Sequence, residues 1–98
     1  MLRHVAVFRW KEGTPPDRIA EVTRRLDELP ARIPEIKGFA VGPDVGSADG
    51  HWDFAVVADF ADLAAYRVYA AHPDHLAAVT EAIVPIRAER AVLQYEAG

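Results

Sequence analysis

The nine residues WDFAVVADF, at positions 52–60, alternate large apolar side chains with small or acidic ones, as a β-strand with one buried face does. One face of this strand carries Ala55 and Val57 between Asp53 and Asp59. The opposite face is wholly apolar and consists of Trp52, Phe54, Val56, Ala58 and Phe60. The alternation therefore predicts a sheet with one side packed against a hydrophobic layer.

The segments on either side of this strand indicate its neighbours. Before it, the polar loop GSADGH (46–51) follows a second strand-like run, GFAVGPDV (38–45). After it, ADLAAYRVYAAH (61–72) has the composition of a helix, and Pro73 stands where a new helix begins. The run PDHLAAVTEAIV (73–84) is expected to continue as that second helix.

The two ends of the chain complete the pattern. HVAVFRW (4–10) is rich in valine and aromatic residues, and ERAVLQYE (89–96) is a further strand-like run. Between Ile19 and Ile33 the apolar residues recur at intervals of three and four, with charged residues on the other side. This spacing predicts an amphipathic helix of about four turns that ends near Pro34.

The resulting order is β-α-β-β-α-β, with the second helix broken near Pro73. This order predicts an α+β fold of the ferredoxin-like, split βαβ type, in which both helices cover one face of a four-stranded antiparallel sheet. We expect one domain over residues 1–98.

The sheet face without helices is too apolar to remain in contact with water. We expect two such sheets to pack face to face in a homodimer, a dimeric α/β barrel. Because the first and third strands are antiparallel neighbours, Arg9 should lie near Asp53 on this face, in an ion pair or a water-bridged contact. The alternative is that both charges are solvated independently. The residues that make this face apolar are Val5, Val7, Ala55 and Val57.

Composition excludes several classes of protein. The net charge of −4 and the scattered lysines and arginines give no basic stripe, so we expect no nucleic-acid partner. The absence of cysteine excludes disulfides, thiolate nucleophiles and cysteine metal sites. Acidic residues interrupt every apolar stretch before membrane-spanning length, so we expect no membrane partner and a cytoplasmic location. The abundance of alanine and arginine indicates a bacterial source.

Four segments in this order, HVAVFRW, IPEIKGF (33–39), WDFAVVADF and YAAHPDH (69–75), resemble the stress-responsive A/B-barrel (Dabb) family of dimeric α+β barrels. The most specific feature is the His-Pro-x-His run at 72–75 together with His4. The family includes a plant polyketide cyclase that catalyses an aldol condensation without a cofactor. The resemblance implies that Tyr69 and His75 match its catalytic tyrosine and histidine, and that His4 matches a histidine of its pocket.

The sequence also departs from that cyclase. Phe54 stands where the cyclase has a third-strand histidine, and Ala6, Thr23 and Ala78 stand where it has bulkier apolar pocket residues. The resemblance therefore implies a type of reaction, namely cyclase or lyase chemistry on a carbonyl-bearing, polyketide-like metabolite. It does not imply the same substrate.

The residue types fit that chemistry. If Pro73 is the first helical residue, His75 lies in the first turn, where the positive end of the helix dipole disfavours an imidazolium and leaves a neutral base. The hydroxyl of Tyr69 could bond to His75 or to a carbonyl that becomes an enolate. Strand parity directs His4 toward the helices and the same apolar cavity.

Each of these residues also has a purely structural interpretation. His75 could be a junction histidine, Tyr69 a core or interface tyrosine, and His4 a core polar group with a satisfied hydrogen bond. His72 is expected to cap the helix. The residues predicted to bind substrate are His4, Ala6, Phe8, Leu26, Phe54, Val56, Ala58, Tyr66 and Ala78.

We expect neither a metal nor another cofactor. His72 and His75 have a spacing that permits a metal, but the only nearby carboxylate, Asp74, points elsewhere on a helix. Two alternatives stay open at this point: a non-enzymatic, stress-responsive dimer whose pocket is filled by side chains, and a cofactor-free monooxygenase. The sequence contains no asparagine, which counts against the second because related monooxygenases typically use that residue.

Overall fold

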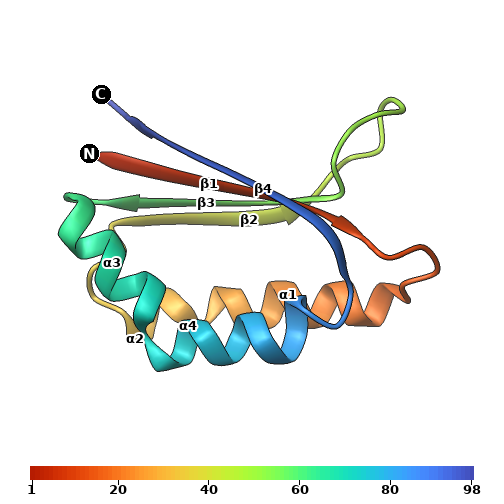
Figure 1. Ribbon diagram of the computed structural model, residues 1–98, viewed down its shortest axis with the longest axis horizontal. Helices are drawn as coiled ribbons and strands as arrows, with labels where there is room; N and C mark the ends of the chain where they lie inside the picture. The colour runs from red at the N-terminus through yellow and green to blue at the C-terminus, as the bar shows by residue number, and fades with distance from the viewer.

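A computed structural model describes residues 1–98 and contains one sheet of four antiparallel strands in the order β2-β3-β1-β4. All the helices lie on one side of the sheet and leave its other side uncovered (Figure 1). The predicted α+β, ferredoxin-like arrangement is confirmed. The strands are β1 (Leu2–Trp10), β2 (Gly38–Pro43), β3 (Phe54–Phe60) and β4 (Arg87–Glu96), and the helical segments are α1 (Pro16–Asp27), α2 (Leu29–Arg32), α3 (Leu63–Ala71), α4 (Pro73–Ala78) and the π-helical turn η1 (Val79–Ile83).

The register of the central strands places the core on the helical side. In the β1–β3 pair, His4 lies opposite Ala58 and Phe8 lies opposite Phe54, and all four side chains are buried. Leu26 from α1 and Ile33 pack onto this layer. Burial of such a side chain contributes roughly 1.5–3 kcal/mol, so this layer is the main source of stability. No helix of the structure is both long enough and apolar enough to cross a bilayer.

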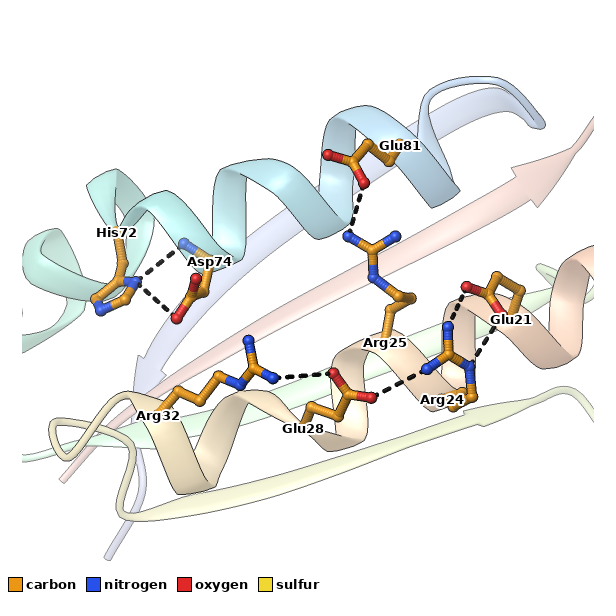
Figure 2. Close-up of polar contacts among 8 residues, drawn as sticks. All are labelled: Glu21, Arg24, Arg25, Glu28, Arg32, His72, Asp74 and Glu81. Carbon is orange, nitrogen blue, oxygen red and sulfur yellow. Dashed lines mark hydrogen bonds and ion pairs between the residues drawn. The ribbon is translucent and has the colours of Figure 1, made fainter.

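The first helical segment is interrupted where the sequence predicts one continuous helix. Glu28 separates α1 from α2, and Pro30 follows in the first turn of α2. Proline has no N–H to donate to the carbonyl four residues earlier, which accounts for a break at this point. Arg24 and Arg32 both pair with Glu28 and so connect the two segments, while Arg25 reaches across to Glu81 at 3.1 Å and ties α1 to η1 (Figure 2).

The second helix is broken at Pro73, as predicted. His72 caps α4, because its Nδ1 accepts a hydrogen bond of 3.1 Å from the backbone N–H of Asp74 (Figure 2). The expectation of one α-helix from 73 to 84 is wrong in its second half. There the N–H of Val84 donates to the carbonyl of Val79 at 2.9 Å, the five-residue spacing of a π-helix.

The predicted ion pair between Arg9 and Asp53 does not form. β3 begins at Phe54, so the strand alternation does not extend back to Asp53, whose Oδ2 accepts a bond of 2.8 Å from the backbone N–H of Trp10. Arg9 instead stacks on Trp52 on the uncovered side, with its guanidinium carbon 4.4 Å from the ring centroid. Trp52, predicted to face the core, is therefore a residue of the uncovered side.

Candidate active site

A cavity of about 130 Å³ lies between the sheet and the helices. Its floor comes from β1 and β3, its walls from α1, α3, α4 and η1, and its rim from β4. Both histidines predicted to face a pocket line it, from different elements of the chain. The lining residues are His4, Ala6, Phe8, Leu26, Val56, Tyr66, Tyr69, His75, Val79, Ile83, Arg87 and Arg90.

The helix break at Pro73 orients His75. His75 Nδ1 lies 3.2 Å from the carbonyl oxygen of Ala70, at the end of α3. A carbonyl can only accept, so Nδ1 carries the proton and donates, and Nε2 of the neutral ring keeps a lone pair. The ring packs against that of Tyr69 with centroids 4.2 Å apart, which fixes its plane. His75 is therefore held in the tautomer of a base.

His4 is held in the opposite tautomer. The amide Nε2 of Gln94 on β4 lies 3.0 Å from His4 Nδ1. An amide nitrogen can only donate, so His4 Nδ1 accepts and the proton of the neutral ring is on Nε2. The ring is 6 % exposed and lies 4.8 Å from that of Tyr66. His4 is thus a core histidine with a hydrogen-bond partner and also a potential donor to a ligand in the cavity.

Both histidines are neutral near pH 7. Burial is the main cause that lowers the pKa of His4, with further lowering from the positive charge of Arg90 and from repulsion between the two rings when His75 is also protonated. Burial also lowers the pKa of His75 most strongly, and Arg90 and His72 add to this, against the opposing effect of the bond to Ala70. A neutral His75 can accept a proton, as a general base must.

Tyr69 supplies a hydroxyl that is kept protonated. Its side chain is 3 % exposed, and burial, with a smaller contribution from Tyr66, raises the pKa of the phenol well above its usual value. The hydroxyl makes no hydrogen bond within the chain. It is therefore free to donate to an oxygen of a ligand.

The cavity brings together eight of the residues singled out from the sequence: His4, Ala6, Phe8, Leu26, Val56, Tyr66, Tyr69 and His75. Three others predicted to bind substrate, Phe54, Ala58 and Ala78, lie in the closely packed core away from the cavity. The alternation of β3 correctly placed Phe54 and Ala58 on the helical side, but it does not tell which buried positions border open volume.

Four lining residues were missed from the sequence. Val79 and Ile83 are four residues apart in the last helical segment, so their helical spacing was a usable signal. Arg87 and Arg90 lie on β4, where a spacing of three gives no such signal, because alternate residues of a strand face opposite sides.

A second, larger hollow of about 610 Å³ lies on the uncovered side near the β2–β3 loop. Its titratable residues, Asp44 and His51, are exposed and pair with each other at 3.1 Å. Because hydrogen bonds in water stabilise a developing charge less than those in a dry cavity, we place the candidate active site in the smaller cavity. No group of three metal-ligating side chains is present anywhere in the structure, and His72, 3.9 Å from Asp74, serves as a cap.

Comparison with known protein families identifies one family for this chain. The model of the stress responsive A/B barrel domain (Dabb) matches residues 2–97. No curated protein matches the chain. A dimeric ferredoxin-like protein of unknown function from Thermobifida fusca is 45 % identical, with a TM-score of 0.91 over 98 % of this chain and 90 % of that one.

Two other solved structures extend the comparison. A Dabb family protein with a ferredoxin-like fold from Mesorhizobium loti is 26 % identical, with a TM-score of 0.81 over 98 % of this chain and 95 % of that one. A hydroxynitrile lyase from Passiflora edulis is 25 % identical, with a TM-score of 0.81 over 96 % of this chain and 90 % of that one. Proteins similar to this chain thus include an enzyme.

Proposed function

The chain belongs to the stress responsive A/B barrel domain (Dabb) family, and from this premise we propose that it binds a small carbonyl compound in its cavity and catalyses proton transfer on it without a cofactor. The observation that carries this proposal is the convergence of His75 and His4 on one cavity in complementary tautomers, one with a free lone pair and the other with a free N–H.

The proposed reaction begins at a carbon next to a carbonyl. His75 Nε2 removes a proton from that carbon, and the electrons of the C–H bond form an enolate. The Nε2–H of His4 and the hydroxyl of Tyr69 donate hydrogen bonds to the oxygen on which negative charge develops. The low pKa of His75 suits a proton that two flanking carbonyls have already made acidic.

The same groups can form or break a carbon–carbon bond. In an aldol cyclisation, the enolate carbon attacks a second carbonyl carbon, and the resulting alkoxide takes back the proton held on His75. The same reaction steps in reverse cleave a carbon–carbon bond, as a lyase does. The similarity to a hydroxynitrile lyase supports this class of reaction, and the family resemblance to a polyketide cyclase supports its forward direction.

The size of the cavity limits the substrate. An apolar cavity of about 150 Å³ holds a benzene molecule. The cavity here, at about 130 Å³, has room for about six non-hydrogen atoms in its enclosed part. Open volume beside His4, Tyr69 and His75 also argues against the alternative in which aromatic side chains fill the pocket.

We further propose that the protein is a homodimer formed through the uncovered sheet face. Two apolar side chains of β4 on that face, Leu93 and Tyr95, are 58 % and 46 % exposed. Val5 and Val57, paired across β1 and β3, continue the apolar surface. The similar protein from Thermobifida fusca is dimeric, which supports the same assembly here. A cytoplasmic location stays a prediction.

Hydrogen–deuterium exchange at carbon tests the catalytic proposal without knowledge of the natural substrate. Acetoacetamide has a methylene group between two carbonyls, and its seven non-hydrogen atoms allow the ketone end to occupy the enclosed volume while the amide end stays at the rim. In D₂O the wild-type protein should speed loss of the methylene proton signal above the buffer rate, and His75→Ala should reduce the protein-catalysed part by about 10²-fold or more. His51→Ala, which removes an exposed histidine outside the cavity, should keep the wild-type rate. Exchange that is equal in wild type and His75→Ala would refute the proposal.

A further inference from the structure

Two arginines of β4, Arg87 and Arg90, line the same cavity as the histidines. They are the only residues with a permanent charge among its lining, although the chain as a whole has 15 acidic and 11 basic residues. No aspartate or glutamate borders the cavity. In a chain of net charge −4, the cavity is therefore a local site of positive charge.

Neither arginine is neutralised within the chain. Arg87 and Arg90 take part in no ion pair and no side-chain hydrogen bond, so their guanidinium donors are available to a ligand. By contrast, five other arginines pair with carboxylates: Arg3, Arg9, Arg24, Arg25 and Arg32.

A β-bulge brings the two arginines to the same side of the sheet. Residues three apart on a regular strand face opposite sides. In the β1–β4 pair, Arg90 lies opposite Phe8 and Arg87 opposite Trp10, with a shift of register between Arg9 and Trp10 that leaves one extra residue on β4. A bulge reverses the alternation beyond it, so both guanidinium groups reach the cavity.

We propose that Arg87 and Arg90 bind a carboxylate of the substrate, which makes the substrate class a small oxo acid. This inference rests on the proposed function, because it assumes that the carbonyl of the same molecule lies between His75 and His4. A guanidinium matches the planar carboxylate with two parallel hydrogen bonds, and two of them can hold one carboxylate at the rim while the carbonyl end occupies the enclosed volume.

A matched pair of ligands isolates the carboxylate. Acetoacetate and acetoacetamide have the same number of non-hydrogen atoms and nearly the same shape, and they differ in charge. Titration followed by NMR of the labelled protein should give tighter binding of acetoacetate by at least about 10-fold, as charge-assisted hydrogen bonds imply. Arg87→Gln and Arg90→Gln should each reduce this preference, because they weaken binding of acetoacetate more than binding of acetoacetamide. Arg67→Gln, an exposed arginine of α3 outside the cavity, should keep it.

Three results would overturn the inference: equal affinity for the two ligands, a preference that survives in both cavity variants, or binding of inorganic phosphate as tight as that of acetoacetate. The last would mean that the arginines attract any small anion. Arg90→Lys retains the charge but lacks the parallel N–H donors of a guanidinium group. Its preference for acetoacetate over acetoacetamide should therefore lie between that of the wild type and that of Arg90→Gln. Thermal unfolding of each variant checks that the fold persists.

Failure of this inference is separable from failure of the proposed function. Exchange in acetoacetamide needs no carboxylate, so catalysed exchange without a preference for acetoacetate would overturn only the arginine site. A preference for acetoacetate without catalysed exchange of either ligand would overturn the catalytic proposal and leave the arginine site in place.

Discussion

Mild acid should destabilise the protein through the two histidines of the cavity. The pKa values of His4 and His75 are lowered in the folded state, mainly by burial, whereas both return to about 6.5 when the chain unfolds. Below about pH 6.5 the unfolded chain therefore binds more protons than the folded one, and the free energy of unfolding falls as the pH falls. Above that pH the stabilisation from their neutral forms is fully present.

The magnitude follows from proton linkage. A histidine that stays neutral in the fold loses at most about 1.4 kcal/mol of stability between pH 7.5 and 5.5, so the two together lose at most about 2.8 kcal/mol. Because His75 is only partly buried, we expect about 1–2 kcal/mol. The carboxylates with lowered pKa values, such as Asp59 and Asp44, lose their contribution only at lower pH and do not overlap this range.

Urea unfolding at pH 7.5, 6.5 and 5.5, at one protein concentration, measures this effect. The free energy of unfolding of a small protein typically falls by about 1–3 kcal/mol per molar urea. The urea midpoint should therefore fall by roughly 1 M between pH 7.5 and pH 5.5. His4→Gln and His75→Gln should each remove part of the decrease, and His51→Ala should leave it intact. A midpoint that is constant or rises between pH 7.5 and 5.5 would refute the claim that the cavity holds neutral histidines.

Three further predictions concern single side chains. Tyr69→Phe should reduce catalysed exchange in acetoacetamide by about 10²-fold, because the variant lacks a hydrogen-bond donor to the enolate oxygen. Its urea midpoint should change little, because the hydroxyl makes no hydrogen bond within the chain. An unchanged exchange rate would exclude a catalytic role for this hydroxyl. Leu26→Ala, at a buried wall of the cavity, should lower the free energy of unfolding by about 2–5 kcal/mol in urea titrations, and a loss under 1 kcal/mol would mean that the cavity wall collapses around it. Val57→Asp should convert the dimer to a monomer in sedimentation velocity, whereas a dimer that persists would place the interface elsewhere.

Much of the fold follows from alternation and periodicity. The run from Phe54 to Phe60 defines one buried face, and Pro73 ends one helix and starts the next, so both features are visible in the sequence. The sequence-based predictions that fail concern residues at the ends of strands and helices. Asp53 continues the alternation in the sequence, but its carboxylate binds the backbone of Trp10, a contact that depends on the paired strand and cannot be read from local pattern.

The candidate site was predictable in part for the same reason. Strand parity places His4 on the helical side, and the resemblance to the Dabb family points to Tyr69 and His75. The hydrogen bond from Gln94 to His4 and the arrival of Arg87 at the cavity depend on the register of β4 against β1. A bulge changes that register by one residue, and one residue is enough to send a side chain to the other face.

The tautomers of His4 and His75 are the most direct test of this account. Long-range ¹H–¹⁵N NMR of uniformly labelled protein at pH 7.5 distinguishes protonated from unprotonated ring nitrogens, and the variants His4→Gln and His75→Gln assign the signals. The structure predicts a neutral His75 with its proton on Nδ1 and a neutral His4 with its proton on Nε2. An imidazolium at either position, or the proton of His75 on Nε2, would contradict the proposal that His75 is the base and His4 the donor.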